Sequence, residues 1–346
     1  MSISAPVAFG IVSPGRWGKI LLDAAKDVPG LRLAGVCGRD AANAAAVAEK
    51  FGGRVLPSYD DLLADPAIEA VVVPTPHFLH HAQTLAALRA GKHVFVEKPI
   101  APTLAEGEGM AREAAARGRV LAVGHQMRFM GFARRLRAML DAGELGTLAH
   151  IAIVHGYPLM LEAKAGDWRT APEHVPGGPL DEFGVHYFDL LAFLCGPARR
   201  VTGSVNRHVT PGTVPDAAVA VIEFANGVIA TYASHFVSTG INRLQLFGTR
   251  GMLEVNRLGQ APSWWQPTGD MAAARTGGPP PQPITFPEPA AMGGALRAEL
   301  ADFAAAIREG RPPEVGARES LAALRIARAV VEAHETGRSV FLSSPA

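Results

Sequence analysis

One segment, residues 71–100, constrains the fold more than any other part of this chain of 346 residues. The apolar run Val71–Val73 stops at a proline, and a second apolar run, His93–Val96, stops at the sequence Glu-Lys-Pro. The stretch between the two runs has the apolar spacing of a helix and ends at Gly91. Strand, helix and strand in this order predict one parallel βαβ unit.

Two polar turns follow the strands of this unit, Thr75–Pro76 and Glu97–Lys98–Pro99. In open parallel sheets, ligands bind just beyond the carboxyl ends of the strands. Lys98 therefore directs a cation at a predicted binding crevice.

The first third of the chain repeats this alternation of short apolar runs and Ala-rich helical stretches. Repeated βα units predict an α/β fold with a doubly wound parallel sheet of the Rossmann type. The predicted strands are Val7–Val12, Leu31–Cys37, Ala70–Val73, His93–Val96 and Val120–Val123.

The pattern changes after His125, and from residue 148 the β-like runs are longer. Turn signals such as Asn226–Gly227 favour hairpins between them. We therefore predict a Rossmann domain over residues 1–125 and an α+β domain over residues 126–346 with a large, mainly antiparallel open sheet. The predicted strands of this sheet are Leu148–Val154, Arg200–Asn206, Ala217–Phe224, Val228–His235, Arg243–Gly248 and Gly251–Val255.

The last part of the chain contains a Pro- and Gly-rich stretch, residues 276–290, which predicts a surface loop or arm. From Arg297 to Thr336 the spacing is helical, and Glu309–Pro313 divides it into two helices. These C-terminal helices could pack back on the Rossmann domain.

Composition excludes several classes of protein. The formal net charge of +1 gives no excess of cations for nucleic acid. No apolar run approaches the roughly 20 residues that cross a bilayer, and we expect no secretory signal because a basic n-region is missing. Two cysteines form no disulfide framework and no metal-ligand pattern, so we expect a cytoplasmic protein without a metal.

The first predicted strand leads into the sequence GIVSPGRWG, residues 10–18. A dinucleotide-binding loop needs small residues for a tight turn, for approach to the pyrophosphate and for helix packing. Serine stands where the first glycine of G-x-G-x-x-G is expected, so the motif alone leaves a plain strand–helix turn open. The expected cofactor-binding loop comprises Ser13, Gly15, Arg16, Trp17 and Gly18.

The end of the second strand indicates the cofactor. Gly38 stands where an NAD-type site has a carboxylate, and Arg39 can pair with a 2′-phosphate. This favours NADP. Arg39 could instead be solvated while Asp40 caps the next helix, and NAD stays possible because Asp40 could turn back to the ribose.

Three motifs resemble those of the Gfo/Idh/MocA oxidoreductases, which are named for glucose-fructose oxidoreductase and inositol dehydrogenase. They are the TP…H…AGKHV…EKP segment, GGPLDEFGVHYFD at residues 177–189, and the closing RESLAALRIARAV at 318–330. The resemblance covers nearly the whole chain. The chain departs from the family at Glu182, where the family has Asp, and Asp181 stands just before it.

The resemblance implies that Lys98, His186 and Glu182 are catalytic. His186 would carry the proton that leaves or enters the substrate oxygen, a contribution of about 10²–10⁴-fold in rate. Lys98 would hold that oxygen, and Glu182 or Asp181 would orient His186 or bind a substrate hydroxyl. A structural histidine is the alternative for His186.

Other residues have two possible roles. Thr75, Pro76, His80 and Glu97 are expected beside the cofactor, although His80 could be a helix-surface histidine and Glu97 structural. Arg128 could bind substrate or pair at the domain interface, and Trp168 and Arg169 could bind substrate or pack. His155 and Tyr157, near a strand end, are possible pocket residues. Trp264–Trp265 is interpreted as interface or core.

The sequence thus predicts an NADP-preferring dehydrogenase or reductase of a sugar, polyol or cyclic diol. Two alternatives are a non-catalytic cofactor-binding sensor and a glycosidase relative that keeps NAD bound. The resemblance also implies a homodimer or homotetramer that forms through the C-terminal sheet.

Overall fold

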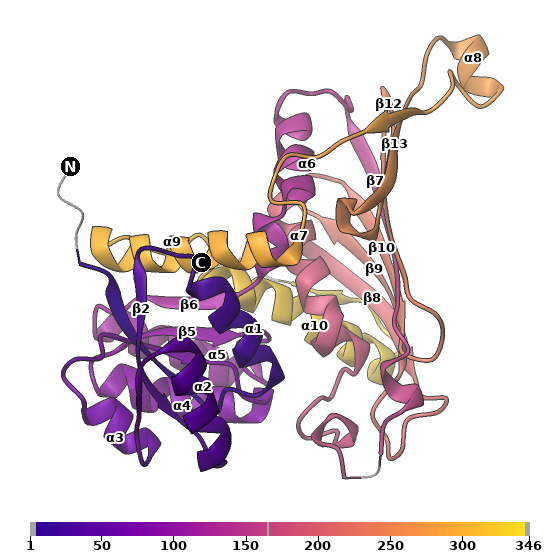
Figure 1. Cartoon of the computed structure of the whole chain (residues 1–346). Helices are drawn as coiled ribbons and strands as arrows, with labels where there is room; N and C mark the ends of the chain where they lie inside the picture. Colours follow the sequence, from indigo (N-terminus) through magenta and orange to yellow (C-terminus); the bar gives the residue numbers. More distant parts are fainter. Residues whose placement is uncertain (1–4, 165, 343–346) are drawn as a thin grey trace. The chain divides into compact units, whose positions relative to one another are not determined.

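A computed structural model describes residues 5–164 and 166–342 of the chain (Figure 1). The chain divides into two compact units. The first comprises Met1–Gln126 and Gly293–Leu321, and the second comprises Met127–Met292 and Ala322–Ala346.

The first unit contains a parallel sheet with strand order β3-β2-β1-β4-β5-β6, which confirms the predicted doubly wound fold. Its strands are β1 (Val7–Val12), β2 (Leu31–Cys37), β3 (Arg54–Val55), β4 (Ala70–Val73), β5 (His93–Glu97) and β6 (Leu121–Gly124). Its helices are α1 (Arg16–Ala25), α2 (Ala41–Phe51), α3 (Tyr59–Ala64), α4 (His77–Arg89), α5 (Leu104–Ala116) and most of α9 (Met292–Glu309). The parallel order brings the carboxyl ends of β1, β4 and β5 to one edge of the sheet.

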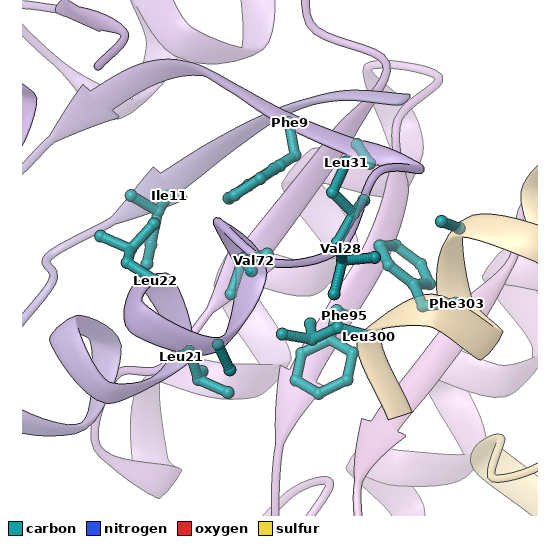
Figure 2. Packing of buried hydrophobic residues seen from close by; sticks show 14 of the residues in the cluster. Phe9, Ile11, Leu21, Leu22, Val28, Leu31, Val72, Phe95, Leu300 and Phe303 are labelled. Carbon is teal, nitrogen blue, oxygen red and sulfur yellow. The ribbon is translucent and has the colours of Figure 1, made fainter. Parts of the chain in front are cut away.

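One face of this sheet is covered by α1 and α9, which lie far apart in the sequence (Figure 2). Leu21 of α1 and Leu300 of α9 belong to the same buried cluster as Phe9 of β1. The rings of Phe95 and Phe303 meet edge to face, with centroids 5.8 Å apart. Burying each such side chain stabilises the fold by about 1.5–3 kcal/mol, so α9 is part of the core that holds the cofactor loop.

The second unit contains a sheet with strand order β14-β13-β12-β11-β7-β10-β9-β8-β15. Of its strand pairs, β7 and β10 run parallel and the rest antiparallel, as predicted for a mainly antiparallel sheet. The strands are β7 (Leu148–Gly156), β8 (Ala198–Asn206), β9 (Ala217–Phe224), β10 (Ile229–His235), β11 (Ile241–Gly248), β12 (Gly251–Asn256), β13 (Ala261–Pro267), β14 (Gln282–Ile284) and β15 (Val340–Phe341).

The helices of the second unit are α6 (Gly131–Asp141), α7 (Val185–Cys195), α8 (Met271–Arg275) and the greater part of α10 (Ala317–Thr336). The 3-10 turns are Gln126–Phe129, Leu159–Leu161, Trp168–Thr170 and Arg257–Gly259, and Leu180–Gly184 is a π-helical turn. Trp264–Trp265 lies in β13, and part of the predicted arm forms the short strand β14. The sequence did not predict these strands because prolines interrupt them.

The two faces of the second sheet differ. Tyr187 and Phe188 of α7 pack on Tyr232 of β10, and α10 approaches β8 so closely that a Cβ at Gly203 would lie 3.0 Å from Val330. On the opposite face, Val219 of β9 is 54% exposed. The sheet therefore has one face covered by helices and one exposed face.

Among the helices that the structure describes, none is both long enough and apolar enough to cross a membrane.

Candidate active site

The loop after β1 places Ser13 in the left-handed backbone region, with φ 48°. Its N–H donates to the Cys37 carbonyl oxygen at 2.7 Å, and its own carbonyl accepts from the Gly15 N–H at 2.7 Å. The left-handed conformation costs an L-residue roughly 1–2 kcal/mol. This explains why a dinucleotide loop usually has glycine at this position and shows that Ser13 adopts the same turn.

The two glycines of the loop serve different purposes. A Cβ added at Gly15 would meet no other group within 4 Å, whereas one at Gly18 would lie 3.1 Å from Pro74. Gly15 thus leaves open space at the start of α1, and Gly18 permits close packing. The first turn of α1 has no acidic residue, so its positive end can face a phosphate. These residues fit the pyrophosphate of a dinucleotide.

The end of β2 has a defined geometry. Asp40 accepts the Asn43 N–H at 3.0 Å and caps α2, which confirms that interpretation of Asp40. The Asn43 side chain donates to the Pro14 carbonyl at 3.1 Å and connects α2 to the cofactor loop. Arg39 is exposed, and no carboxylate in the described ranges forms an ion pair with it. Its guanidinium is available to a ligand.

His80 is fully buried, so the alternative of a helix-surface histidine is wrong. Its ring nitrogens lie 2.8 Å from the Thr75 and Pro99 carbonyl oxygens. Burial lowers the pKa of His80 to about 4, with a smaller contribution from Lys98, although the two carbonyls favour the charged ring. His80 therefore links the turn after β4 with the turn after β5. Thr75, also buried, donates its hydroxyl to Gln83 at 2.6 Å.

Glu97 is a buried carboxyl at the end of β5, 5% exposed. It accepts the Lys98 N–H at 3.2 Å, and a Cβ at Gly124 would lie only 2.8 Å from it. Burial raises the pKa of Glu97 to about 7, while the Trp17 indole and the Lys98 cation act in the opposite direction. The two neighbouring residues thus differ in exposure: Glu97 faces the protein interior, and Lys98 is partly exposed.

In the second unit, the family-like motif at residues 177–189 contains a π-helical turn, Leu180–Gly184, which is followed directly by α7. Such turns occur frequently at functional sites. Gly178 precedes the turn with φ 51°, and a Cβ there would lie 2.0 Å from the Pro215 carbonyl oxygen. His186 is the second residue of α7 and is 6% exposed.

The turn brings three predicted residues together. The Arg169 guanidinium lies 3.4 Å from a Glu182 carboxylate oxygen, and it stacks over the Trp168 ring at 4.3 Å from the centroid. Glu182 is 8% exposed. Trp168 and Arg169, from the turn Trp168–Thr170, thus form one cluster with Glu182 of the π-helical turn that precedes His186.

Two other predicted residues, Arg128 and Asp181, each form an ion pair with a different residue of the second unit. Arg128 forms a two-pronged ion pair with Asp189, with both distances 2.7 Å. Asp181 is 1% exposed and accepts bonds from the Gly177 N–H and the Arg328 guanidinium. These placements favour a structural role for Arg128 and Asp181 over direct contact with a substrate. Sequence reasoning missed Arg328, because nothing in the sequence connects it to a residue 147 positions earlier.

His155 and Tyr157 both lie against the aromatic ring of Phe183, at centroid distances of 4.4 and 5.8 Å. His155 is buried beside Ser234, and burial lowers its pKa to about 4, aided by His235. Tyr157 is 47% exposed. Phe183 therefore connects these two residues to the turn that carries Glu182, a role that its place in the motif did not reveal.

Comparison with known proteins defines the class. Residues 7–125 match the model of an oxidoreductase family with an NAD-binding Rossmann fold, and residues 133–254 match the GFO/IDH/MocA C-terminal domain. The chain is 30% identical to 1,5-anhydro-D-fructose reductase of Ensifer adhaerens over 302 residues, which are 86% of each protein. The protein is thus built as an oxidoreductase with a nucleotide-binding unit.

The chain belongs to the Gfo/Idh/MocA oxidoreductase family. A solved structure described as a putative NADPH-dependent oxidoreductase from Desulfitobacterium hafniense matches with a TM-score of 0.91, 26% identity and 98% coverage of both chains. Levoglucosan dehydrogenase in complex with NADH and levoglucosan has the same fold, with a TM-score of 0.87, 21% identity and coverage of 98% of this chain and 100% of that one.

The pKa of Glu97 predicts a pH-dependent stability. A carboxyl whose pKa rises from 4.5 to about 7 on folding stabilises the protein at low pH, and this contribution is lost as the pH rises through about 7. Glu97→Gln stays neutral, so from pH 5 to pH 8 it should gain about 2–3 kcal/mol in free energy of unfolding relative to wild type.

Urea unfolding of the two proteins without cofactor at pH 5, 6, 7 and 8 measures this difference. Glu49→Gln, at an exposed position of α2, is the matched control and should follow wild type. Parallel pH curves for Glu97→Gln and wild type would show that Glu97 is ionised in the folded protein at pH 5.

Proposed function

We propose that the protein is an NADP-preferring dehydrogenase or reductase that transfers a hydride between nicotinamide C4 and a secondary alcohol or carbonyl of a neutral sugar, polyol or cyclic diol. One observation carries the proposal. Lys98 follows the carboxyl end of β5 at the edge of the sheet where the loop Ser13–Gly18 follows β1. A cation beside a dinucleotide loop suits an oxygen that gains negative charge.

The loop Ser13–Gly18 would hold the pyrophosphate, and Thr75 and Pro76 would line the cofactor beyond it. When bound, the nicotinamide supplies or accepts the hydride. His80 would act through the two turns that it links, because its ring nitrogens already face protein carbonyls.

Lys98 and His186 would carry the remaining chemistry. Lys98 would hold the substrate oxygen and stabilise its alkoxide character, and His186 would take or give the proton. The pair of Arg169 with Glu182 at 3.4 Å supports a role for Glu182 in fixing the turn that presents His186.

The charges of the second unit favour a neutral substrate. The two arginines that the sequence offered for substrate binding are engaged by carboxylates, Arg128 by Asp189 and Arg169 by Glu182. An anionic substrate would compete with these carboxylates. The exposed ring of Tyr157 and the indole of Trp168 suit the apolar face of a sugar or cyclic diol instead. The Ensifer adhaerens relative is named for such a sugar.

A panel of neutral sugars, polyols and diols, followed at the NADPH absorbance band under single-turnover conditions, tests the function. Net reduction of NADP⁺, or oxidation of NADPH, is expected. No absorbance change with any substrate would favour a cofactor-binding sensor, and a change that reverses within one turnover would favour a glycosidase that recycles its cofactor.

The catalytic assignment predicts that Lys98→Met and His186→Ala each lower kcat by about 10²-fold or more, because each removes a charge stabiliser or a proton carrier. Cofactor affinity should stay near wild type, since the dinucleotide loop is unchanged. The double variant should lose little more than either single one, because both residues serve one oxygen.

Steady-state kinetics from pH 5 to 9 and cofactor titration measure these effects. The near-neutral limb of the pH profile should disappear in His186→Ala. Wild-type turnover by His186→Ala would place the proton carrier elsewhere, with His155 and Tyr157 the next candidates.

The preference for NADP rests on Gly38, Arg39 and the capping role of Asp40. Arg39→Ala should weaken NADP binding roughly tenfold or more and leave NAD binding nearly unchanged, since a charge-assisted hydrogen bond contributes about 1.5–3 kcal/mol. Arg32→Ala, at an exposed position near the amino end of β2, the strand that precedes Arg39, is the matched control. Tighter binding of NAD by wild type, or equal losses for both cofactors, would contradict the preference.

We also infer association through the exposed face of the second sheet. Val154, Ala233 and Val219 form a row across β7, β10 and β9 in register, and Val154 and Val219 are 37% and 54% exposed. An apolar sheet face open to water is a liability that a second copy would cover. The two free, buried cysteines fit the cytoplasmic location that we infer for the assembly.

Light scattering at micromolar concentration should therefore give a dimer or tetramer of the 36.3 kDa chain. Val219→Arg should dissociate it, because a cation in this row would be buried in the interface without a partner. Val55→Arg, at an exposed valine of β3 in the first unit, should leave the assembly intact. A monomeric wild type would contradict the inference.

A further inference from the structure

A buried ion pair joins the π-helical turn to α10. The Arg328 guanidinium donates to one oxygen of Asp181, and the other oxygen accepts the Gly177 N–H at 2.7 Å. The side chains are 18% and 2% exposed. Asp181 thus connects three parts of the second unit: the glycines before the turn, the turn itself and α10.

The positive charge of Arg328 is compensated by the Asp181 carboxylate. Its Nε and Nη1 atoms are buried and have no hydrogen-bond partner within residues 5–164 and 166–342. Burial lowers the pKa of Arg328 to about 10. Loss of the Asp181 carboxylate would leave a largely buried charge uncompensated, so the position of Arg328 is coupled tightly to that of Asp181.

The residues that follow Asp181 in the chain carry the proposed chemistry. Glu182 follows Asp181 directly, and His186, at the start of α7, lies five residues after Asp181. The approach to the turn is tight, because a Cβ at Gly177 would lie 3.1 Å from the Asp181 carboxylate. A shift of Asp181 would therefore move the backbone on both sides of it.

We propose that Arg328 is a positioning residue that, through Asp181, fixes the turn presenting Glu182 and His186. This inference deepens the proposed function and rests on the role of His186 there. Arg328 itself contacts Asp181 and no reacting group.

The test separates positioning from simple stability. Arg328→Met and Asp181→Asn each leave one buried group without its partner, and each should lower both Tm and kcat. The double variant Asp181→Asn/Arg328→Met has no uncompensated charge, and its Asn oxygen can still accept the Gly177 N–H. Its Tm should recover toward wild type, whereas its kcat should stay about tenfold or more below wild type, with KM changed less.

A second measurement needs no substrate. Titration of ¹⁵N-labelled histidines by NMR follows His186, whose signals are assigned by their loss in His186→Ala. The double variant should shift the His186 midpoint by about half a pH unit or more, although its charge balance equals that of wild type. Arg318→Met removes an exposed ion pair at the start of α10 and should shift neither Tm nor the midpoint.

Recovery of both kcat and the His186 midpoint in the double variant would overturn the proposal and leave the pair a stabilising contact. The proposed function fails separately: if His186→Ala keeps wild-type turnover, His186 is not the proton carrier, whatever its titration shows. In the His186→Ala background, Arg328→Met should have no further effect on kcat. An undiminished effect there would also overturn the proposal.

Discussion

The imidazole of His80 holds together the two turns on which the first half of the candidate site depends. It bridges the Thr75 and Pro99 carbonyl oxygens at 2.8 Å each, deep in the first unit. The turn after β4 and the turn after β5 thereby share one fixed point, and Lys98 lies beside it. The position of the Lys98 backbone consequently depends on a side chain of α4.

The second unit places several charged side chains near the buried His186. Three arginines, Arg128, Arg169 and Arg328, each pair with a carboxylate on or next to the turn that presents His186. Because each of these three arginines has its own carboxylate partner, the three pairs together add no net charge near His186. Arg128–Asp189 and Arg328–Asp181 are the more deeply buried of these pairs. Buried pairs contribute little stability by themselves but are costly to break, so the geometry around the turn is sensitive to the loss of either partner.

Much of the fold could be predicted because its strands are continuous apolar runs. The bounds of β1, β2, β4 and β9 agree with the sequence prediction to the residue. In the second sheet, β13 and β14 carry prolines and were missed for that reason.

The site could be predicted only as far as local motifs reach. Lys98 and His186 stand within recognisable segments, and Ser13 adopts the glycine-like turn that its position in the motif implied. The burial of His80 and the partner of Asp181 could not be predicted, because both depend on contacts between segments distant in the sequence. Arg328 lies in a helix whose pattern indicates packing alone.

The discontinuity of the first unit has a consequence for how the protein is made. Its sheet is complete by Gly124, yet Leu300 and Phe303 of its core, and the carbonyl of Val315 that accepts the Val123 N–H, come from the last fifty residues or so of the chain. During synthesis, the nucleotide-binding half must therefore wait, with one face only partly covered, until strands β7 to β14 of the second sheet have left the ribosome. A fragment that stops after β6 lacks the same helix, so this half of the protein cannot be separated from the chain as a finished module.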